Sequence, residues 1–224
     1  MTTSLRWTRF ADGPPIPMSR KETIAMFGDP TRGGLYEKVP DPQWEKRYTI
    51  ELHGDEAFLP CLEDNYLDVQ RSLEPAAREA FRRAEEACPG YIYSVGGHVH
   101  RRMRHDTPEK AKREGRKLRD LSEHAYVTAF DINSNDNRAA YFGKGCKRPD
   151  WCDKSVVWPL KCPEPWSPLW LAIWPKGIPQ GVVEAFDSCG YSCGIWWAAG
   201  RAGYSDNMHV QYRGKLHYYP TVVK

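Results

Sequence analysis

One segment of the chain combines an amphipathic helical pattern with a clear stop, and it constrains the fold more than any other feature. In residues 74–88, Ala, Phe and Cys recur at helical spacing, with Arg and Glu on the opposite face. Pro75 suits the first turn of a helix, and Pro89-Gly90 ends it. The run 91–95 that follows is typical of a strand. The sequence therefore predicts a helix that leads directly into a sheet.

A second helix and further strands follow in the same pattern. Residues 179–189 place Val and Phe on one helical face and end at Gly190. Residues 126–132 alternate as a strand does, and strands are also expected at 208–212 and 217–219. This order indicates an α+β fold, in which helices pack on one side of a small antiparallel sheet.

We expect the whole chain, residues 1–224, to form a single domain. Residues 1–70 are rich in Pro, Gly and charge, and predict an irregular N-terminal region wrapped on the domain. The core is expected at 74–219. Within it, residues 146–175 are dense in Cys, Pro and Trp and read as an irregular insertion pinned by aromatic side chains.

Net charge and hydropathy argue against two functional classes, nucleic-acid binders and membrane proteins. The net charge of +3 is too small to predict a nucleic-acid binder, although the run 101–119 is basic. No stretch reaches the ~18 apolar residues of a membrane span, so no membrane insertion is expected. The N-terminal residues show no apolar signal segment and no lipidation motif, which predicts folding in the cytoplasm. The expected oligomeric state is a monomer.

Two histidines and two aspartates have the chemistry of a catalytic metal centre. His124 and Asp131 lie seven residues apart where the chain enters a predicted strand, and Asp206 and His209 lie far downstream. Neutral imidazoles and a carboxylate are natural zinc ligands, and a catalytic zinc needs three protein ligands and an open position for water. His124, Asp131 and His209 supply three ligands, which leaves Asp206 to handle the proton of the water. On spacing alone, a merely hydrogen-bonded polar pair remains the alternative.

Four segments strengthen the metal hypothesis because together they resemble one family. SEHAYVTAFDIN closely resembles the SxHxxGxAxDIN signature of zinc peptidases that act on peptidoglycan, the D-alanyl-D-alanine carboxypeptidases and L-alanyl-D-glutamate endopeptidases, which include many phage endolysins. GGHVHRRMRHD, GYSCGIWW and DNMHVQ are similar to the family segments GxFxPRxIR, GFxWGGxW and DxMHFQ. The four occur in the family order and span residues 96–211.

The resemblance implies one zinc ion per chain, with His124, Asp131 and His209 as its ligands. It implies that Asp206 is the catalytic carboxylate and that Arg101 is the active-site arginine, with Arg104 as a second candidate. Substrate contacts are implied for Ser122 and for Trp196 or Trp197. The implied substrate is the stem peptide of peptidoglycan. The implied enzyme accumulates in the cytoplasm and reaches the wall after release, as an endolysin does.

The chain departs from the family pattern at positions beside the site. Val127 stands where the family has a Gly after the first ligand, and His98 and His100 replace a Phe and a Pro before Arg101. Glycine often marks a backbone conformation that other residues adopt at a cost, so Val127 bears directly on the local geometry.

Several alternatives stay open at this point. The chain is a catalytically inert, metal-binding wall-recognition module if Val127 spoils the site, or a nucleic-acid-binding protein that uses the basic run 101–119. His98, His100 and His105 are expected as surface or supporting residues rather than a second metal site. The cysteines are expected to be buried free thiols or to form an opportunistic disulfide, the alternative being a structural zinc held by Cys146, Cys152 and Cys162 with Cys189 or Cys193.

Overall fold

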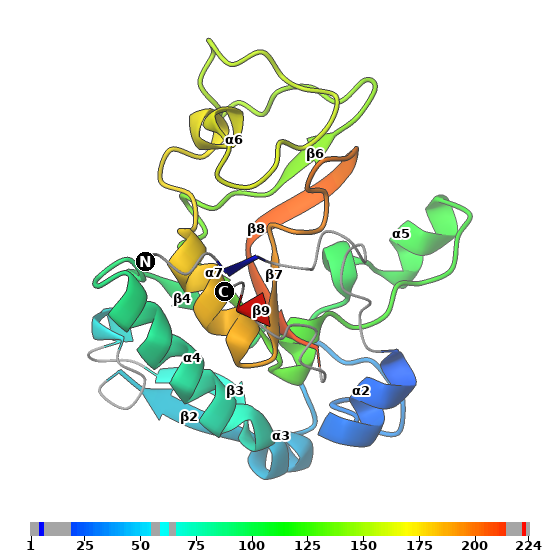
Figure 1. Ribbon diagram of the computed structural model, residues 1–224. Helices are drawn as coiled ribbons and strands as arrows, with labels where there is room; N and C mark the ends of the chain where they lie inside the picture. The colour runs from blue at the N-terminus through cyan, green and yellow to red at the C-terminus, as the bar shows by residue number, and fades with distance from the viewer. Residues whose placement is uncertain (1–4, 7–18, 55–58, 63–65, 214–220, 223–224) are drawn as a thin grey trace.

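The computed structural model describes residues 5–6, 19–54, 59–62, 66–213 and 221–222 (Figure 1). The fold mixes helices with small antiparallel sheets, which confirms the α+β class at this level. The principal sheet has the strand order β4-β5-β8-β6, and β7 pairs with β8 as well. Its strands are β4 (Val95–Gly96), β5 (Ala129–Ile132), β6 (Ala140–Phe142), β7 (Tyr191–Gly194) and β8 (Gly203–Tyr212). Among the described residues, no helix is long and apolar enough to cross a bilayer.

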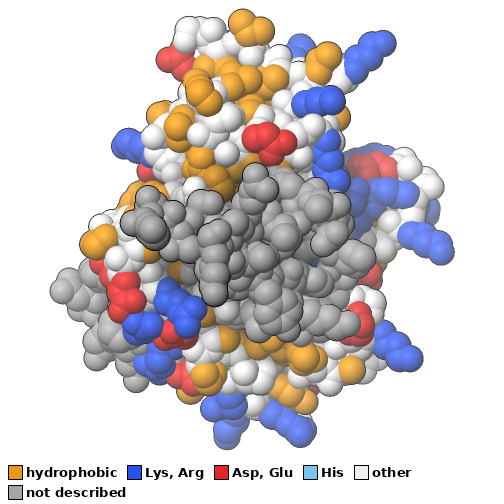
Figure 2. Space-filling view, in the orientation of Figure 1, with side chains coloured by type: hydrophobic (Ala, Val, Ile, Leu, Met, Phe, Trp, Pro, Cys, Tyr) orange, Lys and Arg blue, Asp and Glu red, His pale blue; other side chains and the backbone are white. Residues whose placement is uncertain are grey.

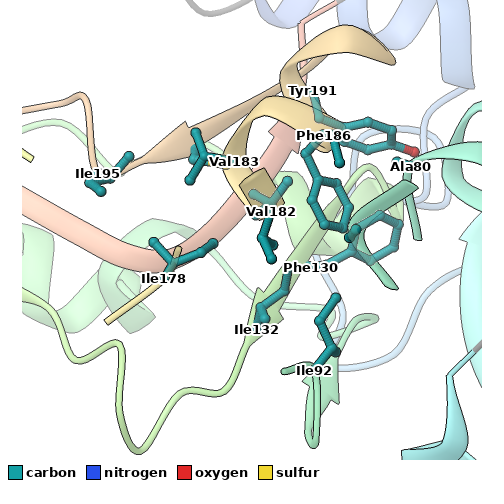
Figure 3. Close-up of a cluster of buried hydrophobic side chains, with 14 of the residues drawn as sticks. Ala80, Ile92, Phe130, Ile132, Ile178, Val182, Val183, Phe186, Tyr191 and Ile195 are labelled. Carbon is teal, nitrogen blue, oxygen red and sulfur yellow. The ribbon is translucent and has the colours of Figure 1, made fainter. Parts of the chain in front are cut away.

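Two helices cover one face of this sheet. They are α4 (Glu74–Ala87) and α7 (Gln180–Ser188), and they confirm the two predicted helices to within two residues. Phe81 of α4 contacts Phe130 of β5 and Phe186 of α7, with ring centroids 5.4 and 5.1 Å apart. Figure 3 shows this cluster, in which side chains from both helices meet those of the strands. The helices approach closely because residue 181 is Gly: a Cβ there would lie 3.1 Å from the Ala87 Cβ.

Strand periodicity separates this covered face from a polar face. In β5, Phe130 and Ile132 point into the buried cluster, and successive side chains of a strand point to opposite faces. Asp131 therefore faces away from the helices. In β8, Val210 joins the same cluster, so its neighbours His209 and Gln211 share the face of Asp131. The register pairs Asp131 directly with His209.

The predicted strand at 91–95 is mostly wrong. Only its last residue enters β4, because a side chain takes the hydrogen bonds that a neighbouring strand would have supplied. Asn133 accepts hydrogen bonds from the backbone N–H groups of Tyr93 and Ser94, both at 3.0 Å, and donates to the carbonyl of Tyr91. The strand predicted at 208–212 is confirmed and extends back to Gly203, whereas the one at 217–219 lies outside the described residues.

The N-terminal region is more regular than expected. It contains α2 (Arg20–Phe27), α3 (Pro42–Tyr48) and the antiparallel pair β2 (Thr49–His53) and β3 (Tyr66–Gln70), and β1 (Leu5–Arg6) pairs with β9 (Thr221–Val222). Helix α2 begins with a capping box, in which Ser19 and Glu22 satisfy each other's backbone N–H groups. Leu52, Leu67 and Val69 are buried in the main core. Strands β2 and β3 are therefore part of the core rather than a wrapping.

The insertion forms a Trp-rich lobe, defined here as residues 143–178, at the top of Figure 1. Its helix is α6 (Pro168–Ile173), capped by the Ser167 side chain. Trp170 and Trp174 are fully buried, with ring centroids 5.3 Å apart. The lobe therefore has an aromatic centre that is continuous with the main core.

Candidate metal centre

Three side chains from three separate elements converge on the polar face of the sheet. His124 lies in a short 3-10 helix (Glu123–Tyr126), Asp131 on β5 and His209 on β8. His124 Nε2 is 3.1 Å from His209 Nδ1, and each of these nitrogens is 3.3 Å from Asp131 Oδ1. We call this group the metal triangle. Both imidazoles are buried.

The outward-facing nitrogen of each imidazole is already bound to an oxygen. His124 Nδ1 lies 2.8 Å from the carbonyl oxygen of Gly97, which can only accept a hydrogen bond. His209 Nε2 lies 2.8 Å from Oε1 of Gln211, another acceptor. These contacts place the proton of each neutral ring on its outer nitrogen, so both inner nitrogens present lone pairs. Hydrogen bonds of this kind orient metal-binding histidines in proteins.

The triangle then has three acceptor atoms and no donor of its own, which favours a bound cation. Zinc–ligand distances of about 2.0–2.1 Å in a tetrahedral shell imply ligand separations of about 3.3–3.4 Å. The observed 3.1–3.3 Å fit that spacing. The buried group of His124, Asp131 and His209 can hold a metal ion, and it is the only such group of three among the described residues.

Backbone strain accompanies this site. Val127, which ends the 3-10 helix of His124, has φ 58° and ψ 32° and is buried. A β-branched residue in this left-handed region is a genuine outlier, and the conformation costs about 1–2 kcal/mol. Val127 therefore adopts the conformation that glycine would adopt freely, and the metal triangle still assembles. Val127 has not spoiled the ligand geometry.

Asp206 lies beside the triangle, and among the described residues only one of its carboxylate oxygens has a hydrogen-bond partner. Its Oδ2 accepts a hydrogen bond of 3.0 Å from the Tyr204 hydroxyl. Its Oδ1 is buried and has no hydrogen-bond partner among the described residues. Gly194 makes room for this arrangement, since a Cβ at that position would lie 2.2 Å from the Asp206 carbonyl oxygen. Asp206 is a neighbour of the triangle and not a fourth corner of it.

A cavity of about 510 Å³ opens onto the triangle. It brings together most of the site residues predicted from sequence: Arg101, Arg104, Ser122, Trp197, Asp206, and the two histidines of the triangle. The Trp197 ring packs 5.2 Å from that of His209. The Ser122 hydroxyl is buried with no hydrogen-bond partner among the described residues, as suits a group that contacts a ligand.

Trp196 is the exception among the predicted site residues. It is 5% exposed, its Nε1 donates to Asp187, and its ring packs edge-on against Trp166 of the lobe. The expectation that it lines the groove is corrected, because the turn after β7 directs Trp196 into the core and Trp197 into the cavity.

The ionisation of the acidic groups follows from their surroundings. Burial alone would raise the pKa of Asp131, but when no metal is bound and the imidazoles of His124 and His209 are protonated, their hydrogen bonds and charge outweigh burial and hold the pKa well below its usual range. Burial raises the pKa of Asp206, and the negative charge of Asp131 adds to this effect. Burial also raises the pKa of Glu123, which lines the same cavity. The site therefore contains one carboxylate with a lowered pKa, Asp131, and one with a raised pKa, Asp206, and the raised pKa suits a group that exchanges a proton.

The residues that orient the two imidazoles and Asp206 were not predicted from the sequence. Gly97 and Gln211 fix the two imidazoles, and Tyr204 fixes Asp206. Gln211 and Tyr204 carried a signal, because Gln211 lies two residues after His209 and Tyr204 two residues before Asp206, so each shares a strand face with its partner. Gly97 acts through its backbone, and no motif marked it.

The other metal hypotheses find no geometric support in the described part of the chain. His98 lies 3.6 Å from Glu45 and 3.7 Å from Asp68, whereas His100 stacks on Tyr36. His105 lies at the cavity wall. All seven cysteines are free, and none belongs to a metal-binding group of three within the described residues.

No family model, curated protein or solved structure matches the chain.

Proposed function

We propose that the chain is a zinc metallopeptidase that hydrolyses an amide bond in the stem peptide of peptidoglycan. The observation that carries the proposal is the metal triangle, three acceptor atoms within 3.3 Å of one another, next to a buried carboxylate with a free oxygen. The resemblance of four sequence segments to peptidoglycan peptidases supports it, because the residues that match the family ligands are those of the triangle.

The chain's own residues suit general acid–base catalysis of hydrolysis. Bound zinc would supply a nucleophilic water at neutral pH and polarise the scissile carbonyl. Asp206 Oδ1 accepts the proton of the attacking water and later delivers one to the leaving amine. Tyr204 holds the opposite oxygen of this carboxylate. Arg101, at the cavity wall, offers a positive charge to the oxygen on which negative charge develops.

The residues that line the cavity suit a bound peptide. Ser122 offers a buried hydroxyl, and Trp197 forms an apolar wall beside His209. We propose the stem peptide as the partner, and action on the wall after release from the cytoplasm by a monomeric enzyme, in the manner of a phage endolysin.

The test is digestion of purified peptidoglycan by the zinc-loaded protein, followed by mass spectrometry of the products. An endopeptidase releases stem peptides cut after L-Ala, whereas a carboxypeptidase removes a terminal D-Ala. The Asp206→Asn protein is the matched control, since it keeps the side-chain volume but cannot accept the proton. Binding to the wall with intact muropeptides would contradict the proposal and support the inert recognition module. Binding to nucleic acid with a steep salt dependence would support the other alternative.

A further inference from the structure

The basic run forms one wall of the cavity, and its charge is larger than that of the whole protein. Residues 101–119 contain nine Lys or Arg and three acidic residues, a net charge of +6 against +3 for the entire chain. The segment includes α5 (Pro108–Arg113), which extends at the right of Figure 1, and Lys and Arg side chains gather there in Figure 2. The rest of the chain is therefore net negative.

A single arginine forms ion pairs with two of the three acidic residues of this segment. Arg116 binds both oxygens of the buried Asp106, at 2.7 and 2.6 Å, and its Nε donates to Glu114 at 2.7 Å. Glu109 lies in the first turn of α5, where a negative charge is favourable. The remaining cations of the segment keep their charge for other partners.

Three of those cations line the cavity. They are Arg101, Arg104 and Arg119, and none of their guanidinium groups forms an ion pair with a carboxylate among the described residues. The backbone of Arg119 is anchored, since its N–H donates to Asp106 and its carbonyl accepts from Arg102. Of the acidic groups at the same cavity, Asp206 has a buried Oδ1, and Glu123 accepts a hydrogen bond of 3.1 Å from the Thr128 hydroxyl. The cavity wall thus offers positive charge that the protein itself leaves unbalanced.

Arg104 is held in place at an energetic cost. Arg104 and His105 both have positive φ, 56° and 49°, which side chains rarely adopt. The Arg104 guanidinium lies over the rings of Tyr204 and Tyr141, 5.7 and 5.9 Å from their centroids. Strain of this kind persists where the surrounding structure enforces it, and it concentrates at binding sites. Arg104 is therefore an exposed cation that lines the cavity mouth, with its guanidinium placed over two aromatic rings.

We propose that Arg104 and Arg119 form an anion subsite that binds two carboxylates of the substrate, next to the reacting amide. This inference rests on the proposed function and narrows it to acidic stem peptides whose side carboxylates are free rather than amidated. Guanidinium groups bind carboxylates through paired charge-assisted hydrogen bonds, which a neutral carboxamide cannot reproduce. Arg101 remains assigned to the developing charge at the scissile bond.

The experiment compares two synthetic tetrapeptides of L-Ala, γ-linked D-Glu, diaminopimelate and D-Ala. One has free side carboxylates, and the other carries both as carboxamides. Binding is measured by calorimetry to the full-length, zinc-loaded Asp206→Asn protein, which does not consume the peptide. The free peptide should bind at least about tenfold more tightly, since one charge-assisted hydrogen bond contributes about 1.5 kcal/mol or more.

Matched variants separate the subsite from general attraction. Arg104→Gln and Arg119→Gln should each weaken binding of the free peptide by about tenfold and leave the amidated peptide unaffected. Arg113→Gln removes the same charge from an exposed position of α5 outside the cavity, and should leave the preference intact. Equal binding of the two peptides, binding of neither, or an Arg113 effect as large as the Arg104 and Arg119 effects would overturn the subsite.

Hydrolysis by the wild-type protein distinguishes the two proposals. Cleavage of both peptides with equal kcat/KM would leave the peptidase function standing and contradict the anion subsite. Selective binding of the free peptide without any cleavage would support the subsite and contradict the peptidase function.

Discussion

The metal triangle and the Trp-rich lobe both concentrate side chains that bind metals, yet only the triangle assembles them. The triangle takes His124, Asp131 and His209 from three separate elements, and strand register sets Asp131 opposite His209. The lobe contains three cysteines within 17 residues, but they do not converge with another ligand among the described residues. Closeness in sequence is thus a poor guide to a metal site, whereas alternation on paired strands is a good one.

Protonation separates the two regions as well. Burial raises the pKa of the Cys162 thiol to about 12, so the thiolate that binds metals is scarce at neutral pH. In the triangle, the outer nitrogens are committed to oxygens and the inner ones keep their lone pairs. The lone pairs of the triangle are therefore available to a cation, whereas the Cys162 thiol of the lobe is a buried core group.

Removal of a triangle ligand gives the largest expected effect. Wild-type protein should hold about one zinc per chain, and His124→Ala or His209→Ala should abolish both zinc binding and hydrolysis, because two ligands do not retain a catalytic zinc. Elemental analysis after gel filtration gives the zinc content. Full zinc occupancy in either variant would show that the ligands are wrong.

The cysteines provide the control for this experiment. Alkylation under native conditions should leave the zinc content at one per chain, and a reductant should leave activity unchanged. A second equivalent of zinc that is lost on alkylation would instead establish a cysteine-built site, and would break the contrast between the two regions.

The sequence predicted the three residues of the metal triangle but not the contacts that orient them. His124, Asp131, Asp206 and His209 were accessible because motif and spacing mark them. Gln211 and Tyr204 lie two residues from His209 and Asp206 on the same strand, and this spacing places each pair on one face without predicting a hydrogen bond between them. The family resemblance itself stays a prediction.

The same limit applies to the fold. Helices α4 and α7 follow from periodicity and clear stop signals, and both were predicted. The strand expected at 91–95 had the right composition, but Asn133 satisfies its backbone through a contact some 40 residues away in sequence. The β2–β3 pair was overlooked because its flanking Pro and Gly residues suggested an irregular region.

Asp206→Asn should have the next largest effect and should act on rate alone. Asn keeps the volume of the side chain and its bond from Tyr204, but it cannot accept the proton of the attacking water. The hydrolytic rate should fall by about 10²–10⁴-fold, the range of positioned general acid–base groups. Zinc content and Tm should match the wild type. Loss of zinc would make Asp206 a ligand, and an unchanged rate would remove its catalytic role.

Trp174→Ala, in the Trp-rich lobe, should reduce the stability of the fold and leave zinc binding unchanged. Trp174 is 1% exposed, packs against Trp170 and donates to the carbonyl of Arg138 at 2.8 Å. Truncating such a residue costs about 3–5 kcal/mol, measurable as a lower midpoint of urea unfolding. The folded protein should still bind one zinc. Leu171→Ala, on the exposed side of α6, is the control and should change the midpoint little. Coupled loss of zinc would show that the lobe supports the triangle.

Tyr204→Phe is the smallest and most specific test, because the lost atom is a single hydroxyl. Without its hydrogen bond, Asp206 is less well oriented, and kcat should fall by about tenfold, the equivalent of one hydrogen bond to a charged group. KM should stay constant, since the hydroxyl contacts the carboxylate and not the substrate. Zinc content should also be unchanged.

The pH profile and a paired variant decide whether orientation is the cause. Burial raises the pKa of Asp206 and the Tyr204 hydrogen bond lowers it, so Tyr204→Phe should move the acidic limb of kcat to higher pH. Tyr141 is the register partner of Tyr204, with ring centroids 4.6 Å apart, and Tyr141→Phe removes a hydroxyl from the same aromatic pair. That control should keep the wild-type kcat and pH profile. Equal losses in both variants would attribute the effect to packing, whereas a loss confined to Tyr204→Phe, with the shifted limb, assigns it to the positioning of Asp206.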